Sequence, residues 1–289
     1  MVVDNLTFKL SDVSDTLFLT LYSRVFESRS TDPLIDDPQA EAIAEKLTPI
    51  LAQSDKKMLR KLAQGKLDSR LVVHIALRAR KYDAYTRDFL AQHPDGIVVN
   101  MGCGLDTRFH RVDNGRFHLY DLDLPEVMAV KRQVLAETDR YHFIGQSVLD
   151  VAWVEMLKAE WGERPFLFLA EGLFMYLQPE PVKALILKLR ETFTGAELVF
   201  EAVNERLTRP LMRRMVEFKM QKELGIGAGA GYYFGIKDGL EPESWHPGIK
   251  FLDEWVYFDE PEKKIGWMRS FRHLEMFRTT QWTVHYRLN

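Results

Sequence analysis

The sequence has a single cysteine, almost no net charge and no long hydrophobic run, and each absence excludes a class of protein. Cys103 has no second cysteine to pair with, so neither an intramolecular disulfide nor a cysteine-based zinc cluster can form. The 39 Lys and Arg residues nearly balance the 42 Asp and Glu residues, which leaves no positive excess for a nucleic acid or an anionic membrane. An apolar stretch at 17–22 is far shorter than the roughly 20 residues of a spanning helix. We therefore expect a cytoplasmic protein without a metal and without a nucleic-acid or membrane partner.

Short apolar runs alternate with helical patterns along the middle of the chain. The run between Gly96 and Gly102 is rich in β-branched residues, which is typical of a buried strand. Similar runs follow, with helical periodicity at 125–137 and 179–193 between them; they lie at 117–120, 141–144, 166–170 and 197–200. Apolar strands separated by helices predict a doubly wound, parallel α/β sheet whose ligands bind beyond the carboxyl ends of its strands.

Both ends of the chain depart from this alternation. The beginning is helical in pattern, and a later part combines a helical segment with a glycine-rich run at 225–231. We interpret that run as a hinge or lid tip, because no Lys-Ser/Thr follows it as in a phosphate loop. The alternating polarity of 282–288 predicts an antiparallel strand at an edge of the sheet. The chain is thus expected to be a single domain, 1–289, with a helical extension (1–93), a cofactor-binding core (94–203), a substrate lid (204–270) and terminal strands (271–289).

A glycine turn follows the first predicted strand and opens a helix. Gly102 and Gly104 allow the backbone to approach a ligand closely. A dinucleotide fingerprint would need a third glycine where Thr107 stands, which argues against NAD. Asp123 follows at the end of the next strand. A two-glycine turn with a downstream acid fits S-adenosylmethionine, whose ribose hydroxyls need a carboxylate and which has no phosphate.

Each of these residues also has a purely structural explanation. Gly102 and Gly104 are sufficient to turn the chain from strand to helix without any ligand. Asp123 would also stabilise the start of a helix at Pro125 through the helix dipole. Asp121 lies on the same side of the strand as Asp123 and is the competing acid. The choice between the two aspartates depends on the motifs that surround them.

Four motifs in one order resemble the leucine carboxyl methyltransferase superfamily, and its bacterial branch most of all. That branch includes polyketide O-methyltransferases of the tetracenomycin type. The resemblance covers roughly 10–205, and its motifs lie at 78–83, 98–108, 121–127 and 170–177. It implies a class I S-adenosylmethionine-dependent methyltransferase fold, Rossmann-like and mostly parallel with seven strands, carrying a helical N-terminal extension and a helical lid insertion.

The resemblance also implies roles for individual residues toward S-adenosyl-L-methionine. Arg78 matches an arginine that binds the methionine carboxylate, for which the paired donors of a guanidinium are suited. Gly102 and Gly104 match glycines that lie against the methionine moiety. Asp123 matches the acid that binds the ribose hydroxyls. Glu171 matches an acid at the methionine end, where a carboxylate accepts hydrogen bonds from the ammonium group.

The adenine end departs from the family pattern. Ser147 stands at the matching position, where the family usually has an aspartate near the adenine amino group, and the following Val148 is also expected to bind the cofactor. Serine accepts a hydrogen bond but lacks the charge, so we expect either weaker cofactor binding or a neighbouring role for Asp150. Asn100 stands where many methyltransferases carry an acid, although asparagine is common in this family.

Methyl transfer from a sulfonium is a direct displacement, so the enzyme must align the acceptor and exclude water. A carboxylate acceptor needs no base, whereas a phenol or alcohol with a pKa of ~10 or above needs a group that takes its proton. The catalytic candidates, which no motif anchors, are His246, His273 and Tyr232. We expect an O-methyltransferase acting on a hydroxyl or carboxyl oxygen of a small, polyketide-like molecule. The alternatives are a methyltransferase for protein C-termini, an NAD-dependent oxidoreductase and a catalytically inactive cofactor-binding protein.

Overall fold

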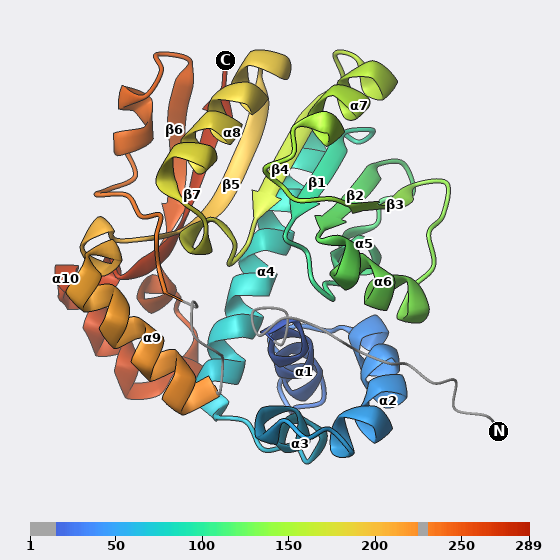
Figure 1. Ribbon diagram of the computed structural model, residues 1–289, viewed down its shortest axis with the longest axis vertical. Helices are drawn as coiled ribbons and strands as arrows, with labels where there is room; N and C mark the ends of the chain where they lie inside the picture. Colours follow the sequence, from blue (N-terminus) through green and yellow to red (C-terminus); the bar gives the residue numbers. More distant parts are fainter. Residues whose placement is uncertain (1–15, 225–230) are drawn as a thin grey trace.

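The structure is a computed structural model that describes residues 16–224 and 231–289 (Figure 1). Most of the expected glycine-rich hinge therefore lies outside the described residues. The described strands form one seven-stranded sheet in the order β3-β2-β1-β4-β5-β7-β6. Their bounds are β1 Ile97–Met101, β2 His118–Asp123, β3 Tyr141–Gly145, β4 Phe166–Ala170, β5 Ala196–Val203, β6 Ile249–Trp255 and β7 Gln281–Leu288.

Strands β1 to β5 are parallel, so their carboxyl ends meet at one edge of the sheet. β1 pairs with β2 and β4, β2 pairs with β3, and β4 pairs with β5. The register places Asn100 opposite Asp121, and Asp123 opposite Gly145. The five apolar runs are therefore strands, and the expected doubly wound, mostly parallel sheet is confirmed.

The far side of the sheet differs from the sequence-based expectation. β7 is antiparallel, as its alternating polarity predicts, but it lies between β5 and β6. The prediction of an edge strand was wrong because its polar side chains face partners within the molecule: His285 and Arg287 both bind Glu197 of β5. The edge strand is β6, which falls inside the range 204–270 that we expected to form the lid.

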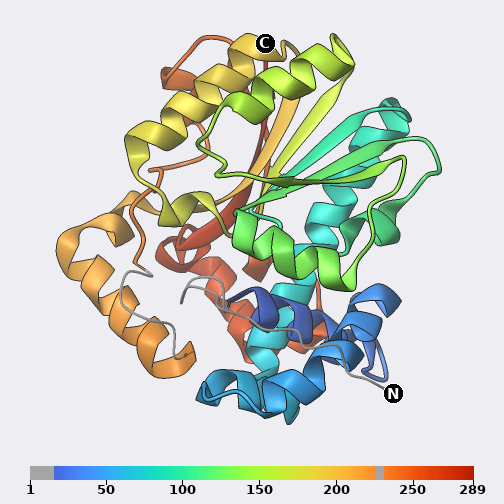
Figure 2. The same cartoon turned by 45° about the vertical axis from the view of Figure 1, so that its right-hand side comes forward.

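Helices cover both faces of the sheet, and a helical group made by the start of the chain lies beyond its carboxyl edge (Figures 1 and 2). One apolar core joins that group to one face of the sheet, and a second core joins α7 and α8 to the other. Consecutive residues of β1 divide between them, since Val98 belongs to the first core and Val99 to the second. The helix bounds are α1 Thr16–Ser28, α2 Pro38–Ala52, α3 Lys57–Ala63, α4 Ser69–Gln92, α5 Arg108–Val112, α6 Pro125–Val134, α7 Ala152–Trp161, α8 Pro179–Thr192, α9 Pro210–Leu224 and α10 Glu275–Arg278.

Aspartates fix the starts of two helices that matter for the site. The Asp37 side chain accepts from the backbone N–H of Ala40 at 3.0 Å, and Pro38 occupies the first turn of α2. Asp68 accepts from the backbone N–H of Arg70 at 2.8 Å and caps α4. α4 has 24 residues and is therefore about 36 Å long. It passes from the N-terminal helical group to the face of the sheet, and its middle reaches the carboxyl edge.

Candidate functional site

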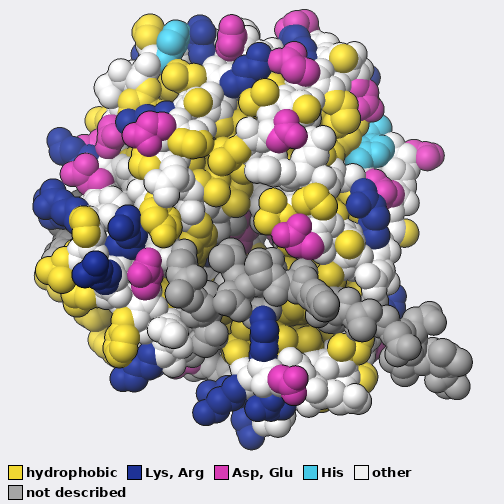
Figure 3. All heavy atoms as spheres, in the orientation of Figure 1, with side chains coloured by type: hydrophobic (Ala, Val, Ile, Leu, Met, Phe, Trp, Pro, Cys, Tyr) yellow, Lys and Arg dark blue, Asp and Glu magenta, His cyan; other side chains and the backbone are white. Residues whose placement is uncertain are grey.

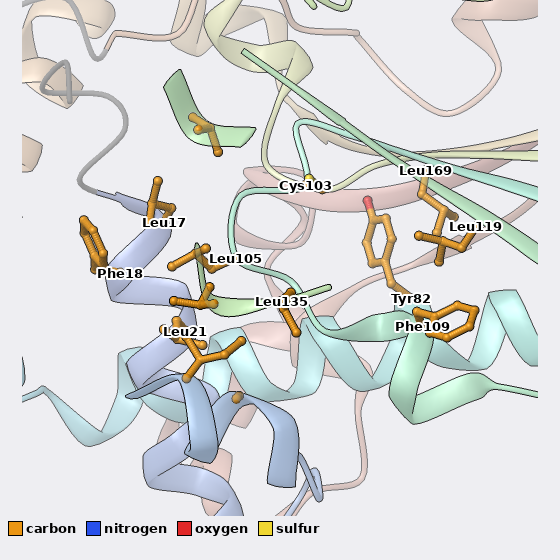
Figure 4. Packing of buried hydrophobic residues seen from close by; sticks show 14 of the residues in the cluster. Leu17, Phe18, Leu21, Tyr82, Cys103, Leu105, Phe109, Leu119, Leu135 and Leu169 are labelled. Carbon is orange, nitrogen blue, oxygen red and sulfur yellow. The ribbon is translucent and has the colours of Figure 1, made fainter. Parts of the chain in front are cut away.

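The glycine turn after β1 lies at the carboxyl edge, against side chains from two other parts of the chain. Gly102 and Gly104 have φ values of +66° and +51°, a region that favours glycine. A Cβ on Gly102 would lie 2.8 Å from Leu173, and one on Gly104 would lie 3.2 Å from the Cβ of Leu17. Figure 4 shows Leu17 on α1 and Leu105 in the loop after β1. The turn therefore needs glycine for both conformation and space.

The structure separates the two competing aspartates at the end of β2. Asp121 is 1% exposed and fully engaged, with Lys131 Nζ at 2.5 Å, the Tyr141 hydroxyl at 2.5 Å and Asn100 Nδ2 at 3.0 Å. It therefore neutralises a buried lysine and has a structural role.

Asp123 lies at the last position of β2, beside the glycine turn. One carboxylate oxygen accepts from the backbone N–H of Gly104 and the other from that of Leu124, both at 2.8 Å. Burial raises the pKa of Asp123, and these two N–H donors oppose the shift. Each oxygen keeps a lone pair, so Asp123 remains able to accept hydrogen bonds from a ligand at this edge.

Arg78, near the middle of α4, binds two carboxylates at the ends of β4 and β5. Its Nε lies 2.9 Å from Oε1 of Glu171, and its Nη1 lies 2.9 Å from Oε2 of Glu201. Burial raises the pKa of Glu171, but the guanidinium groups of Arg78 and Arg108 outweigh that effect and hold it below the usual range. The structure thus brings together the predicted Arg78 and Glu171, and it adds Glu201.

Arg108, 1% exposed, extends this cluster toward the glycine turn. Its Nη2 lies 2.7 Å from Oε2 of Glu171, its Nε 2.9 Å from Asp83 and its Nη1 2.9 Å from Asp106. Buried ion pairs of this kind stabilise a site only when every charge has partners. Here each carboxylate has at least one guanidinium within hydrogen-bond distance.

Two more arginines connect the cluster to the N-terminal helices. Arg111 binds Asp83 at 2.7 Å and Asp37 at 2.8 Å. Arg24 on α1 binds Asp37 at 3.0 Å and donates to the carbonyl oxygen of Leu105 at 2.8 Å. The whole cluster contains four arginines and five carboxylates, namely Arg24, Arg78, Arg108, Arg111, Asp37, Asp83, Asp106, Glu171 and Glu201. It therefore carries one excess negative charge.

The loop after β3 contains the residues expected at the adenine end. The Ser147 hydroxyl accepts from the backbone N–H of Leu149, and Val148 is buried. Asp150 is exposed and accepts from a backbone N–H at the start of α7. The preceding Gln146 has a buried Oε1 without a hydrogen-bond partner in the described part of the chain. Its backbone N–H donates to the carbonyl oxygen of Asp123 at 3.0 Å, which joins this loop to β2.

The three catalytic candidates are not brought together. His246 precedes β6 near the opposite edge of the sheet, where its Nδ1 accepts from the backbone N–H of Gly248. His273 is exposed and accepts from Arg272. Tyr232 alone is near the cluster: it is 8% exposed, and burial raises its pKa, with further contributions from Tyr176 and Glu201. No set of three or more His, Cys, Asp or Glu side chains in the described ranges is arranged to hold a metal.

Sequence reasoning missed several residues at this edge. Glu201 lies inside an apolar strand, 123 positions from Arg78, and a buried charge in such a strand is the only signal that could have marked it. Gln146 is adjacent to the predicted Ser147 but has no distinctive motif. Figure 3 shows that the surface is hollowed near the centre of the view, with hydrophobic side chains along the rim. Among the described helices, none combines the length and apolar composition required to cross a bilayer.

Comparisons with known proteins agree with this architecture. The family model for leucine carboxyl methyltransferase matches residues 18–190. The tetracenomycin polyketide synthesis O-methyltransferase TcmP of Streptomyces glaucescens is 31% identical over 279 residues, which cover 93% of this chain and 95% of TcmP. The S-adenosyl-L-methionine-dependent methyltransferase dpfgK of Gibberella zeae is 23% identical, with 94% and 91% of the two chains covered.

A solved structure shares the fold. A candidate methyltransferase from Thermobifida fusca superposes with a TM-score of 0.55 at 15% identity, over 99% of this chain and 97% of that chain. The expected class I methyltransferase fold is thus confirmed, as is the resemblance of the four motifs, and NAD-dependent oxidation is not the activity of this family. The chain belongs to the leucine carboxyl methyltransferase family and is an S-adenosylmethionine-dependent methyltransferase.

Proposed function

We propose that this enzyme transfers the methyl group of S-adenosylmethionine to an oxygen atom of a small aromatic molecule. The observation that carries the proposal is the gathering of the glycine turn, Asp123, Arg78 and Glu171 at one edge of the sheet. These groups suit the methionine end and the adenosine end of the cofactor. The choice of oxygen is supported by the similarity to TcmP, a tetracenomycin polyketide synthesis O-methyltransferase.

The methionine end of the cofactor fits the arginine cluster. Nε and Nη1 of Arg78 are engaged by Glu171 and Glu201, whereas Nη2 makes none of the hydrogen bonds found among the described residues. Its two N–H groups remain available for the methionine carboxylate. Glu171 is held ionised by Arg78 and Arg108 and suits the ammonium group. S-adenosylmethionine carries one net positive charge at pH 7, which the excess negative charge of the cluster favours.

The ribose and adenine ends fit the loops after β2 and β3. Asp123 would accept from the ribose hydroxyls with the lone pairs that its backbone donors leave unused. Gln146 Oε1 is a buried acceptor without a partner in the described structure, and the adenine amino group is a donor. We assign that hydrogen bond to Gln146, which would compensate for Ser147 in place of the family's usual aspartate. Val148 would contribute apolar contact at the same end.

When bound, the cofactor supplies an electrophilic methyl group on its sulfonium. The residues of this chain then bind, orient and exclude water. Arg78 and Glu171 fix the methionine end, and Asp123 with Gln146 would fix the adenosine end. Such positioning of the two reactants supplies much of the rate in a direct displacement.

A binding and product experiment tests the proposed function. Isothermal titration is expected to show binding of S-adenosylmethionine and S-adenosylhomocysteine and none of NAD. Methyl-labelled cofactor is then incubated with hydroxylated aromatics, with carboxylated aromatics and with a peptide ending in leucine. Mild alkali releases methanol from esters and not from ethers, so it distinguishes the oxygen that was methylated. Labelled nitrogen, or label on the peptide alone, would overturn the proposal.

Replacing Gln146 by leucine is expected to weaken S-adenosylhomocysteine binding about 5–10-fold, the effect of one neutral hydrogen bond. The free energy of unfolding without cofactor should stay the same or increase, because the native oxygen is buried without a partner. Titration calorimetry and urea unfolding measure the two effects. Gln133→Leu, an exposed glutamine on α6, is the matched control. An unchanged dissociation constant in Gln146→Leu would remove Gln146 from the adenine site.

A further inference from the structure

A cavity lies near the arginine cluster, and none of the sequence motifs includes its lining residues. It has a volume of about 290 Å³ and lies between α4 and the residues around 257–281. Its apolar lining comes from Leu71, Tyr257, Phe258, Met268 and Phe277. Ligand pockets generally measure about 300–1,000 Å³ and combine apolar walls with a few polar groups. The volume of this cavity is just below that range, so it suits only a small ligand.

The cavity is next to the methionine end of the proposed cofactor site. His74 lines it and lies one helical turn before Arg78 on α4. Gln281 also lines it and donates through Nε2 to Oε1 of Glu201 at 2.6 Å, and Glu201 in turn binds Arg78. The side chains of His74 and Gln281 thus lie between a molecule in the cavity and the arginine cluster. A molecule bound in the cavity would therefore lie on the methionine side of the proposed cofactor site.

Two polar groups in the lining lack protein partners. His74 makes a ring contact with Tyr257 at 4.6 Å, but neither of its ring nitrogens hydrogen-bonds to another described residue. Burial, with a further contribution from Arg78, lowers the pKa of His74 to about 3, so the imidazole is neutral at pH 7. Tyr257 is 5% exposed, and its hydroxyl has no hydrogen-bond partner within the described ranges. His74 is half-buried, whereas the Tyr257 hydroxyl is a buried polar group whose missing hydrogen bond costs free energy that a polar ligand would recover.

The charges around the cavity favour an uncharged acceptor. Arg70 is the cation in its lining, and it is exposed and paired with Asp68 at 2.9 Å. Arg78, behind the wall, is already bound by Glu171 and Glu201. A carboxylate in the cavity would lose its hydration without gaining a cation, whereas a hydroxyl needs only a hydrogen-bond acceptor.

Resting on the proposed function, we propose that this cavity binds the acceptor as a flat, uncharged hydroxyaromatic molecule of one or two rings, with its hydroxyl donating to His74. In the transfer, the acceptor oxygen forms a bond to the methyl carbon. The carbon–sulfur bond breaks, and its electron pair stays on sulfur. The hydroxyl proton passes to a ring nitrogen of His74 and then to solvent at the cavity mouth. The imidazole is neutral before the transfer, because burial and Arg78 lower its pKa, and it becomes neutral again when it gives the proton to solvent.

The experiment uses the full chain saturated with S-adenosylhomocysteine and the probes 2-naphthol and 2-naphthoate. We expect 2-naphthol to bind more tightly, and Met268→Trp, which fills the cavity, to weaken its binding at least tenfold. Binding of S-adenosylhomocysteine should stay within twofold of the unmodified protein. Failure of S-adenosylhomocysteine to bind would contradict the proposed function. Normal cofactor binding together with no binding of 2-naphthol, tighter binding of 2-naphthoate or no effect of Met268→Trp would overturn the acceptor site alone.

His74→Gln tests the proton acceptor. We expect kcat for methylation of 2-naphthol to fall at least 100-fold, the usual effect of losing a general base, while naphthol binding changes less than fivefold. The rate of the variant should increase with pH toward the pKa of the naphthol, because only the ionised acceptor then reacts. His93→Gln, at the other end of α4, is the control and should keep the original pH profile. An unchanged kcat, or an unchanged pH profile, in His74→Gln would overturn the role of His74.

Discussion

Replacing Arg78 by lysine is expected to weaken binding of S-adenosylhomocysteine at least tenfold, and replacing it by leucine at least 100-fold. Lysine keeps the charge but has no planar fork with which to bind Glu171, Glu201 and a ligand carboxylate together. Leucine leaves two buried carboxylates without their shared cation, and this also lowers the free energy of unfolding by about 3–5 kcal/mol. Titration calorimetry measures the affinities, and urea unfolding measures the stabilities.

The two variants at Arg78 separate loss of binding from loss of folding. Because the lysine variant retains the positive charge, it should remain folded at 25 °C. Its weaker binding of S-adenosylhomocysteine then measures the contribution of the planar guanidinium group of Arg78. Arg80→Leu provides a control on the same helix, since Arg80 is 38% exposed and pairs with Glu260. Its affinity should not change. A folded Arg78→Leu protein with the affinity of the unmodified chain would contradict the assignment of Arg78 to the cofactor.

The second large effect is a contrast between two aspartates on β2. Asp123→Asn should weaken S-adenosylhomocysteine binding at least tenfold, through the loss of a charge-assisted hydrogen bond, and change the free energy of unfolding by less than about 1 kcal/mol. Asp121→Asn should lower the free energy of unfolding by about 3–5 kcal/mol, because Lys131 is fully buried against it.

The same two measurements, calorimetry and urea unfolding, are made on both aspartate variants. If Asp121→Asn is too unstable to purify, Lys131→Met in combination with it should restore folding by removing the unpaired charge. Weakened binding in a stably folded double variant, together with unchanged binding in Asp123→Asn, would reverse the assignment of the two aspartates.

Much of the fold could be predicted because its signals are local in the sequence. The apolar runs that form β1 to β5 are short, rich in β-branched residues and bounded by glycine or polar residues. The spacing of the apolar residues and the length of each run were therefore sufficient to predict strands. β6 was missed because only Ile249 among its residues is buried, and its sequence carries charges at positions without a regular period. β7 was predicted as a strand, but its place in the sheet depends on Glu197, which no local pattern connects to it.

The residues of the candidate site that lie in sequence motifs could be predicted. The residues that belong to it only through ion pairs with distant parts of the chain could not. The glycine turn and Glu171 follow directly after strands and lie within the family motifs. The resemblance therefore predicted them by residue number. Two of the three carboxylates that bind Arg108 are 63 and 25 positions away, and such ion pairs exist only after the chain has folded. His74 was not predicted for the same reason: it becomes a cavity residue because Tyr257 and Phe277 are brought against α4 by the last part of the fold.

The position of β7 has a consequence for how the molecule is made. β5 pairs with β7 along its whole length, and β7 is the last of the seven described strands to be synthesised. At ~5–20 residues per second, translation of 204–280 leaves the hydrogen-bonding groups along that side of β5 uncovered for several seconds. An open strand of this kind can pair with another nascent chain. Expression conditions that slow the ribosome over this interval are therefore expected to raise the aggregated fraction.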